Sequence, residues 1–141
     1  GYRRSALAPD ELIAAVILPK LAPHATFFVD KISKRYDQDI SAVCAAYRLS
    51  MTSGRMHAVR IAFGGMGATP QRALRAEQAL EGHELANATF ARAMAALGEE
   101  FEPIADWRAS AEYRMLIATN LLRRLQLRLA APGTPIEMDQ L

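Results

Sequence analysis

The sequence has little of what extracellular, metal-binding and membrane proteins depend on. Its 141 residues include one cysteine, Cys44, which excludes an internal disulfide framework and a CxxC metal site. Its three histidines lie far apart and form no ligand spacing. No apolar run approaches the roughly 20 residues of a membrane span, and residues 1–9 lack the apolar core of a signal peptide. We therefore expect a cytoplasmic protein with no metal site and no membrane partner.

Lysine is also scarce, with 3 lysines against 14 arginines and a net charge of +2. This charge is too mild for a nucleic-acid-binding protein, so we expect no nucleic-acid partner. With 51% apolar and 23% charged residues, the composition is that of an ordinary globular protein. The length predicts a single domain over residues 1–131, followed by a tail over residues 132–141. Because the first residue is Gly rather than Met, we expect a fragment of a longer subunit.

The hydrophobic pattern changes near residue 68, from short runs and alternation to helical spacing. Strands followed by helices predict an α+β fold with segregated layers. Residues 12–18 form a short, continuous apolar run that predicts a strand, with a helix as the alternative. Residues 25–32 are rich in aromatic and β-branched residues and predict a second strand. Residues 33–39 then form a charged loop.

Residues 43–51 and 58–63 carry the best local signal in the sequence. Apolar residues alternate in both segments, and Thr52-Ser53-Gly54 separates them, which predicts a β-hairpin. One face of the hairpin carries Val43, Ala45, Tyr47, Leu49, Met51, Val59, Ile61 and Phe63. The other face is rich in alanine, which would let another element approach it closely.

Three helices are predicted after the glycine-rich segment 64–67. Thr69-Pro70 is typical of a helix start, and this first helix can end at Gly82. The second begins at Asn87, ends at Pro103 and has an apolar stripe of Phe90, Met94, Leu97 and Phe101. The third begins after Ser110, and its expected buried side is Leu116, Leu121, Leu122, Leu125 and Leu129.

The chemistry-bearing residues form no complete active site, so we predict no catalytic residue. The segment Gly64–Gly67 favours a tight turn over a phosphate cradle, because it fits no phosphate-binding motif. The run Lys31–Asp39 favours a solvated loop over a loop that presents charge to an anionic ligand. For Cys44 we expect a buried, inert thiol. Arg108, Glu112 and Arg114 frame the start of the third helix, where an interface or an ion pair between Arg108 and Glu112 is favoured over a catalytic role.

Four blocks, in order, resemble one known family. They are the opening Gly1-Tyr2-Arg3-Arg4 with Leu7–Glu11, the segment Lys31–Val43, the segment Ile61–Pro70, and Asp106–Arg114 running into Asn120–Arg124. Together they are similar to the C-terminal domain of the FAD- and iron-sulfur-carrying subunit of bacterial xanthine dehydrogenase. The carbon monoxide dehydrogenase flavoproteins share this domain. The match covers residues 1 to about 128.

The resemblance implies a three- to four-stranded antiparallel sheet packed against a three-helix bundle. It also implies an NAD-dependent oxidoreductase: a molybdenum-cofactor subunit hydroxylates a purine, and electrons pass through [2Fe-2S] clusters and FAD to NAD. Two positions that contact FAD in the family correspond to Ile13 and Lys31. The implied partners are the preceding FAD-binding domain, the iron-sulfur domain and the molybdenum subunit, none of which is in this chain. Alone, the chain is expected to be inactive.

Two alternatives remain open from the sequence. The first is a flavoprotein subunit of a carbon monoxide dehydrogenase or aldehyde oxidase-type hydroxylase, because the resemblance implies that the substrate binds on the molybdenum subunit. The second is a non-enzymatic interaction module that binds an acidic partner through the arginine-rich third helix, where residues 108–128 hold five arginines and one glutamate.

Overall fold

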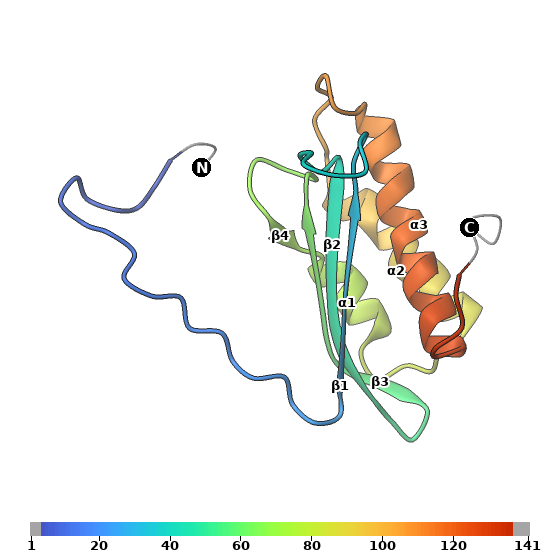
Figure 1. The fold of residues 1–141 in the computed structure, drawn as a ribbon. Coiled ribbons are helices and arrows are strands. Elements are labelled where there is room, and N and C mark those ends of the chain that lie inside the picture. Colours follow the sequence, from blue (N-terminus) through green and yellow to red (C-terminus); the bar gives the residue numbers. More distant parts are fainter. Residues whose placement is uncertain (1–3, 137–141) are drawn as a thin grey trace.

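A computed structural model describes residues 4–136 as an antiparallel sheet with helices on one side. The strands are β1 (Ala25–Ile32), β2 (Val43–Thr52), β3 (Arg55–Gly64) and β4 (Gln71–Arg72), in the order β1-β2-β3-β4. The helices are α1 (Leu74–Leu80), α2 (Asn87–Glu100) and α3 (Ala111–Ala130). Figure 1 shows the helices grouped beside the sheet. The predicted α+β fold is confirmed.

The predicted hairpin forms the centre of the sheet. Strands β2 and β3 pair in register from Cys44 opposite Gly64 to Thr52 opposite Arg55, with an irregularity between Arg48 and Ser50. The connecting turn has positive φ at Ser53 and Gly54, +50° and +74°. The face that carries Val43 to Met51 and Val59 to Phe63 is buried except for Met51, which is exposed at the end of the hairpin. Alternation therefore determined both the pairing and the buried face.

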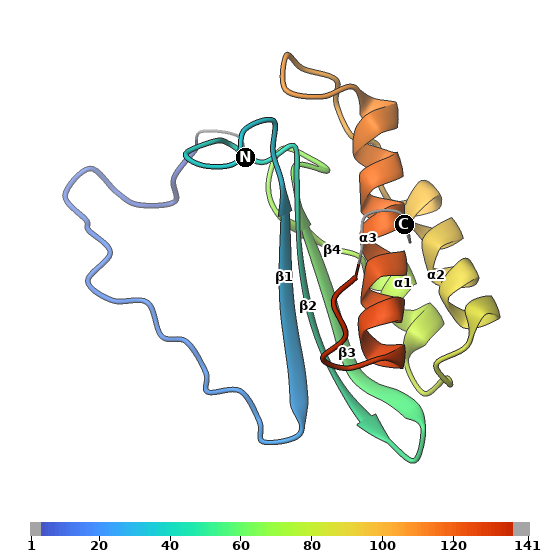
Figure 2. The same cartoon turned by 45° about the vertical axis from the view of Figure 1, so that its right-hand side comes forward.

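The three helices cover only one face of the sheet (Figure 2). Tyr47, Ile61 and Phe63 point from the sheet into the core and meet the apolar sides of the helices. We call the other face the open face. No helix within residues 4–136 lies over it. Its register rows are Phe27, Arg48 and Arg60; Val29, Ala46 and Ala62; and Lys31, Cys44 and Gly64.

Helices α2 and α3 begin at the positions that the sequence predicts. On α2, Phe90 and Leu97 are buried, and Phe101 at the helix end joins the same core. Helix α3 begins after Ser110, whose hydroxyl accepts a hydrogen bond from the backbone N–H of Tyr113 at 3.1 Å. Leu121, Leu122 and Leu125 are buried as expected. Leu116 is 57% exposed, so that part of the prediction is wrong.

The start of the first helix is also predicted wrongly. After Thr69-Pro70 the chain adds the short strand β4 to the sheet, and α1 begins only at Leu74. Ala73 at the N-cap supplies no side-chain oxygen. Instead, the carboxylate of Glu100 on α2 accepts from the backbone N–H groups of Leu74 and Arg75. A tertiary contact thus replaces the local cap that the sequence pattern suggested.

Residues 12–18 form neither a strand nor a helix in this structure. They belong to an extended arm, residues 4–24, that leaves the lower end of β1 (Figure 1). A strand needs a neighbour for its backbone groups, and the arm lies beside none. The prediction of a strand at residues 12–18 is therefore wrong. Of the predicted tail, residues 137–141 lie outside the described residues.

Candidate functional site

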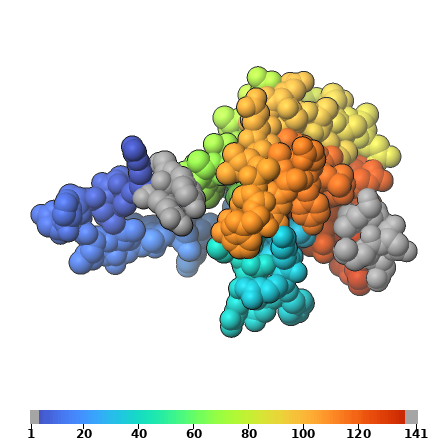
Figure 3. Space-filling model, turned by 90° about the horizontal axis from the view of Figure 1, so that it is seen from above, coloured from blue at the N-terminus to red at the C-terminus, as the bar shows by residue number. Residues whose placement is uncertain are grey.

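Three segments that the sequence singled out come together at one end of the sheet. They are loop 33–42 after β1, the turn 64–67 after β3, and segment 104–110 before α3. Seen from above, loop 33–42 and segment 104–110 lie side by side (Figure 3). The Lys34 ammonium joins them, donating to the backbone carbonyl of Trp107 at 2.8 Å.

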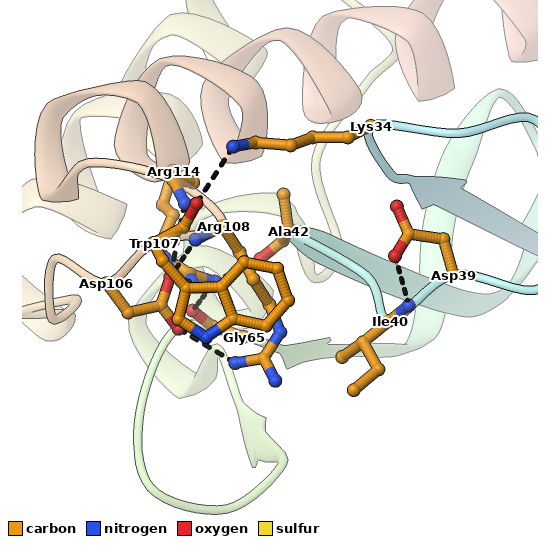
Figure 4. Close-up of polar contacts among 10 residues, drawn as sticks. Lys34, Asp39, Ile40, Ala42, Gly65, Asp106, Trp107, Arg108 and Arg114 are labelled. Atoms are coloured by element: carbon orange, nitrogen blue, oxygen red, sulfur yellow. Dashed lines mark hydrogen bonds and ion pairs between the residues drawn. The ribbon is translucent and has the colours of Figure 1, made fainter.

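Arg114 of α3 holds these three segments together from the inside. Its side chain is 3% exposed. One guanidinium nitrogen, Nη1, donates to the carbonyls of Ala42 and Gly65, the latter at 3.0 Å. The other, Nη2, donates to Oδ1 of Asp106 at 2.7 Å (Figure 4). One buried cation therefore sets the relative positions of the loop, the turn and the segment.

The turn after β3 can approach this cation only because Gly65 has no side chain. Gly65 has a φ of +85°, a region that other residues rarely adopt. A Cβ there would lie 2.2 Å from the carbonyl oxygen of Ala42 and 3.0 Å from Nη1 of Arg114. The prediction of a tight turn with close packing is confirmed at this position. The turn leads into β4, so no helix N-terminus follows it, and the phosphate-cradle alternative is not supported.

Asp106 is the acidic counterpart of Arg114 at this end. Partial burial alone would raise the pKa of Asp106. Hydrogen bonds from the backbone N–H groups of Arg108 and Ala109, and from the guanidinium groups of Arg114 and Arg108, outweigh that effect and lower the pKa to about 2. The carboxylate stays ionised at neutral pH and locks the segment that precedes α3.

A cleft of about 450 Å³ lies on the surface between the turn and segment 104–108. Its charged lining consists of Asp106, Arg108 and Arg114, which leaves a net charge of +1. The Arg108 guanidinium also stacks 4.3 Å from the centre of the Trp107 ring. Cys44 lines the cleft and is half-buried, so the prediction of a buried thiol is not met.

Lys31 lies close to this end of the sheet, on the open face. It is the last outward residue of β1 and sits opposite Cys44. Its ammonium donates to the backbone carbonyl of Asp39 at 2.7 Å, which folds loop 33–39 back over the strand end. Hydrogen bonds from the backbone N–H groups of Arg35 and Ile40 lower the pKa of Asp39. Residues 34–38 are exposed, so the predicted solvated loop is confirmed, and these hydrogen bonds give it a defined shape.

Ile13 lies on the arm and is 67% exposed. In Figures 1 and 2 the arm runs on the side of the sheet away from the helices, which is the side of the open face. The structure does not bring Ile13 into contact with Lys31. It leaves both side chains on the same side of the sheet, with the Ile13 side chain uncovered.

One predicted ion pair is replaced by another. Arg108 pairs with Asp106 at 3.0 Å rather than with Glu112. Glu112 lies in the first turn of α3, where its own backbone N–H and the Ser110 hydroxyl lower its pKa. Residue spacing missed the true partner because Arg108 precedes the helix, so helical spacing does not apply to it.

No sequence pattern gives Arg114 or Asp106, the residues that organise this end, a role of its own. They lie within a block that carried the family resemblance, and that block was their only signal.

A second ion pair joins α3 to the sheet. The carboxylate of Asp30 on β1 accepts from both terminal nitrogens of Arg128 at 2.7 and 2.8 Å. Asp30 is 6% exposed, so it anchors α3 on the sheet from within.

The described residues fit a position at the rim of a flavin site. Ile13 offers an exposed apolar side chain, Lys31 offers a cation on the same side, and the nearby cleft carries a net positive charge. Among residues 4–136 no glycine-rich turn leads directly into a helix, the arrangement that would hold a pyrophosphate. These residues therefore fit the ring portion of FAD better than its phosphates.

Residues 4–136 contain no group of three or more His, Cys, Asp or Glu side chains placed to hold a metal ion. Among the same residues, no helix combines the length and the apolar character that crossing a bilayer needs.

Comparison with known proteins gives a consistent family. Xanthine dehydrogenase of Emericella nidulans is 36% identical over 104 residues, which cover 72% of this chain and 8% of that protein. The putative xanthine dehydrogenase FAD-binding subunit XdhB of Escherichia coli is 29% identical over 139 residues, 97% of this chain and 48% of that subunit. The chain therefore spans less than half of either relative.

A solved structure agrees with this relationship. Reconstituted CO dehydrogenase from Oligotropha carboxidovorans superposes with a TM-score of 0.70 and 27% identity, over 76% of this chain and 37% of that one. The family model described as CO dehydrogenase flavoprotein C-terminal domain matches residues 29–129, which include most of the sheet and of the helices and all residues that line the cleft. The chain belongs to the CO dehydrogenase flavoprotein C-terminal domain family, the flavoprotein C-terminal domain of the molybdenum hydroxylases.

Proposed function

We propose that this chain is the C-terminal domain of the flavin subunit of a xanthine dehydrogenase-type enzyme, and that it completes the FAD site of that subunit. In this proposal it packs on a preceding FAD-binding domain, beside an iron-sulfur domain and a molybdenum-cofactor subunit, in a cytoplasmic enzyme of purine catabolism. Bound FAD would carry electrons from [2Fe-2S] clusters to NAD after purine hydroxylation at the molybdenum subunit. The chain itself supplies contacts and no catalytic residue.

One observation carries the proposal: Lys31 and the arm that bears Ile13 lie on the same, uncovered side of the sheet. In this proposal, one ligand held on that side contacts both residues. In a protein whose core is already complete on the helix side, an exposed isoleucine and a cation on the open face are surfaces for contact with something else.

The two side chains have different roles in this proposal. Ile13 packs against the apolar ring system and excludes water from it. The Lys31 ammonium stabilises negative charge on the reduced ring and so raises its reduction potential. The Asp39 carbonyl holds this ammonium in place, and Asp39 itself is fixed by its hydrogen bonds to Arg35 and Ile40. The ordered loop 33–39 would then lie at the ring edge that meets NAD.

A carbon monoxide dehydrogenase-type parent enzyme remains the second candidate, supported by the family match and by the superposition on CO dehydrogenase. The interaction-module alternative has less support. Four of the five arginines in residues 108–128 are engaged within the chain: Arg108 and Arg114 with Asp106, and Arg124 and Arg128 with Asp30. Most of the arginines that would bind an acidic partner therefore already form ion pairs that fix α3 and the segment before it.

The test is Lys31→Ala in the complete enzyme. We expect NADH formation to slow at least several-fold, while purine oxidation with an artificial acceptor that draws electrons at the molybdenum side stays near wild type. Lys31→Arg should restore part of the NADH rate, and Lys20→Ala on the exposed arm is the control that should change neither. Equal losses in both assays would show that Lys31 matters for folding rather than for the flavin.

A flavin titration of the chain alone tests how much of the site it holds. We expect no stoichiometric binding below ~10 μM, since that affinity corresponds to nearly 7 kcal/mol from a few contacts. Tight yellow binding by the chain alone would overturn the idea that most of the FAD site lies elsewhere.

A further inference from the structure

The end of β1 that carries Lys31 depends on one buried peptide group, that of Ala42. Ala42 is 4% exposed. Its backbone N–H donates at 2.8 Å to the carbonyl of Ile32, the residue directly after Lys31. Its own carbonyl accepts from Nη1 of Arg114 (Figure 4). The Lys31 ammonium donates to the carbonyl of Asp39, three residues before Ala42. Ala42 therefore connects the Arg114 guanidinium both to the backbone next to Lys31 and to the acceptor of the Lys31 side chain.

The loop between Lys31 and Ala42 has one other side-chain hydrogen bond to the rest of the described chain. It runs from the Lys34 ammonium to the carbonyl of Trp107 at 2.8 Å and lies at the exposed surface, where water competes for both groups. The Arg114 side chain is 3% exposed, and hydrogen bonds from a charged group are stronger in such surroundings. We therefore expect the position of the loop to depend mainly on Arg114.

Asp106 fixes the guanidinium that makes this contact. Its Oδ1 accepts from Nη2 of Arg114 at 2.7 Å, and the same oxygen accepts from the backbone N–H groups of Arg108 and Ala109 at 2.9 and 3.1 Å. The carboxylate is thus anchored on the backbone before α3 and holds the guanidinium in the direction of Ala42. Contacts lead without a break from Asp106 through Arg114 and Ala42 to the end of β1.

We propose that Arg114, held by Asp106, is a positioning residue for the flavin, because it determines through Ala42 where the Lys31 ammonium lies against the reduced ring. The inference rests on the proposed function. The attraction between two charges falls with distance, so a displaced ammonium stabilises negative charge on the ring less well. Weakening the Arg114 contact should therefore lower the reduction potential of the flavin, even though Arg114 is buried and acts only through Lys31.

The primary test is the midpoint reduction potential of the flavin in Arg114→Lys of the complete enzyme. Lysine keeps the positive charge but loses the planar fork that reaches several acceptors at once. A change in potential then cannot come from the charge of Arg114 itself. We expect a downward shift of at least half of that caused by Lys31→Ala, with NADH formation slowed several-fold and flavin content unchanged. An unchanged potential would overturn the proposal.

Asp106→Asn tests the same contact by the sign of its effect. Loss of a nearby negative charge would by itself favour the negatively charged reduced ring and raise the potential. A guanidinium that is no longer held would displace Lys31 and lower it. We expect a decrease, and an increase would overturn the proposal. This variant also decides the matter if Arg114→Lys does not fold, and failure of both variants to fold would show a purely structural role and overturn it.

A double variant shows whether Arg114 acts through Lys31. If it does, Arg114→Lys has nothing left to displace once the ammonium is gone. We expect Lys31→Ala with Arg114→Lys to have the same potential as Lys31→Ala alone. Shifts that add in the double variant would mean that Arg114 affects the flavin independently, which would overturn the proposal.

Arg72→Lys is the matched control. It makes the same exchange at another arginine that pairs with a buried carboxylate, that of Glu77, in a part of the sheet that loop 33–41 does not contact. We expect Arg72→Lys to lower the urea midpoint while the flavin potential stays at the wild-type value. An equal fall in potential in this control would show that general loosening of the domain is the cause.

Hydrogen exchange on this chain tests the first contact without any flavin. We expect the Ala42 amide to exchange at least about tenfold faster in Arg114→Lys than in wild type, because the peptide group is no longer held from its carbonyl side. Unchanged slow exchange at Leu121, Leu122 and Leu125 would show that α3 is still folded. Equal protection of Ala42 in both proteins would overturn the proposal.

The outcomes separate this inference from the function on which it rests. If Lys31→Ala leaves the flavin potential unchanged, the proposed role of Lys31 fails, and the inference fails with it. If Lys31→Ala lowers the potential while Arg114→Lys and Asp106→Asn do not, the inference alone is overturned and the proposed function stands.

Discussion

On the helix-covered face of the sheet, Tyr47, Ile61 and Phe63 are almost completely buried, whereas on the open face Phe27 and Val29 remain half exposed. The charges differ in the same way. Asp30, which points to the covered face, is engaged by Arg124 and Arg128, but Arg48 and Arg60 on the open face have no acidic partner among residues 4–136.

This difference separates what holds the domain together from what it offers to a partner. The covered face satisfies its apolar surface and its charges internally, so it can fold without help. The open face and the arm keep apolar and cationic side chains uncovered, which costs stability in isolation. Changes on the two sides should therefore affect the isolated chain very differently.

Gly65→Ala should have the largest effect on stability, because Gly65 lies where Arg114 of α3 donates hydrogen bonds to the end of the sheet. A positive φ combined with a Cβ 2.2 Å from the Ala42 carbonyl leaves no room for the side chain. We expect a loss of about 4 kcal/mol in the free energy of unfolding, measured by urea denaturation. Gly54→Ala has the same backbone strain but no atom within 4 Å of the new Cβ, and it should cost only about 1 kcal/mol. Equal losses would show that strain rather than the contact dominates.

A pair of leucine truncations compares the core with the arm directly. Leu122 is fully buried and Leu18 is 82% exposed. Leu122→Ala should cost about 3 kcal/mol through lost burial and a residual cavity. Leu18→Ala should change the stability of the isolated chain by less than about 0.5 kcal/mol. A large effect of Leu18→Ala in the isolated chain would mean that the arm packs on the domain after all.

The Asp106 carboxylate should make stability depend on acid pH. Its pKa is about 2 in the folded chain, below the ordinary value of 3.8 that it regains on unfolding, so protonation favours the unfolded chain. The stabilising effect is fully present above about pH 4 and is lost as the pH falls through about 2. We expect the urea midpoint of Asp106→Asn to fall less steeply than wild type over that window, while Asp10→Asn, which makes the same change on the exposed arm, follows wild type. Parallel curves for Asp106→Asn and wild type would contradict the assignment.

Arg48→Gln should have the smallest effect and the opposite sign. It removes a like-charge neighbour of Arg60, so the isolated chain should become more stable by about 0.5 kcal/mol. The control is Arg72→Gln near the same face, which removes the partner of buried Glu77 and should destabilise the chain by about 1–2 kcal/mol. A loss of stability from Arg48→Gln would show that Arg48 has a favourable contact within the chain.

Much of the fold could be predicted because its signals are local. Alternation from Val43 to Leu49 determined which hairpin face is buried, and Ser110 supplied its own helix cap. The start of α1 could not be predicted from Thr69-Pro70, because the capping oxygens come from Glu100, 26 residues away from Leu74. The strand expected at residues 12–18 failed because pairing needs a neighbour that the local sequence does not specify.

Part of the candidate site could likewise be predicted from the sequence, and part of it could not. Gly65 was recognised as a tight turn, and the family resemblance pointed to Ile13 and Lys31, but no spacing rule linked Asp106 to Arg114 or either to Ala42. By itself the sequence determined the hairpin, the second and third helices and the family, because periodicity and motif order are written along the chain. Only the tertiary structure decided which face stays open, where the arm leaves and which charges pair, because those contacts join residues tens of positions apart.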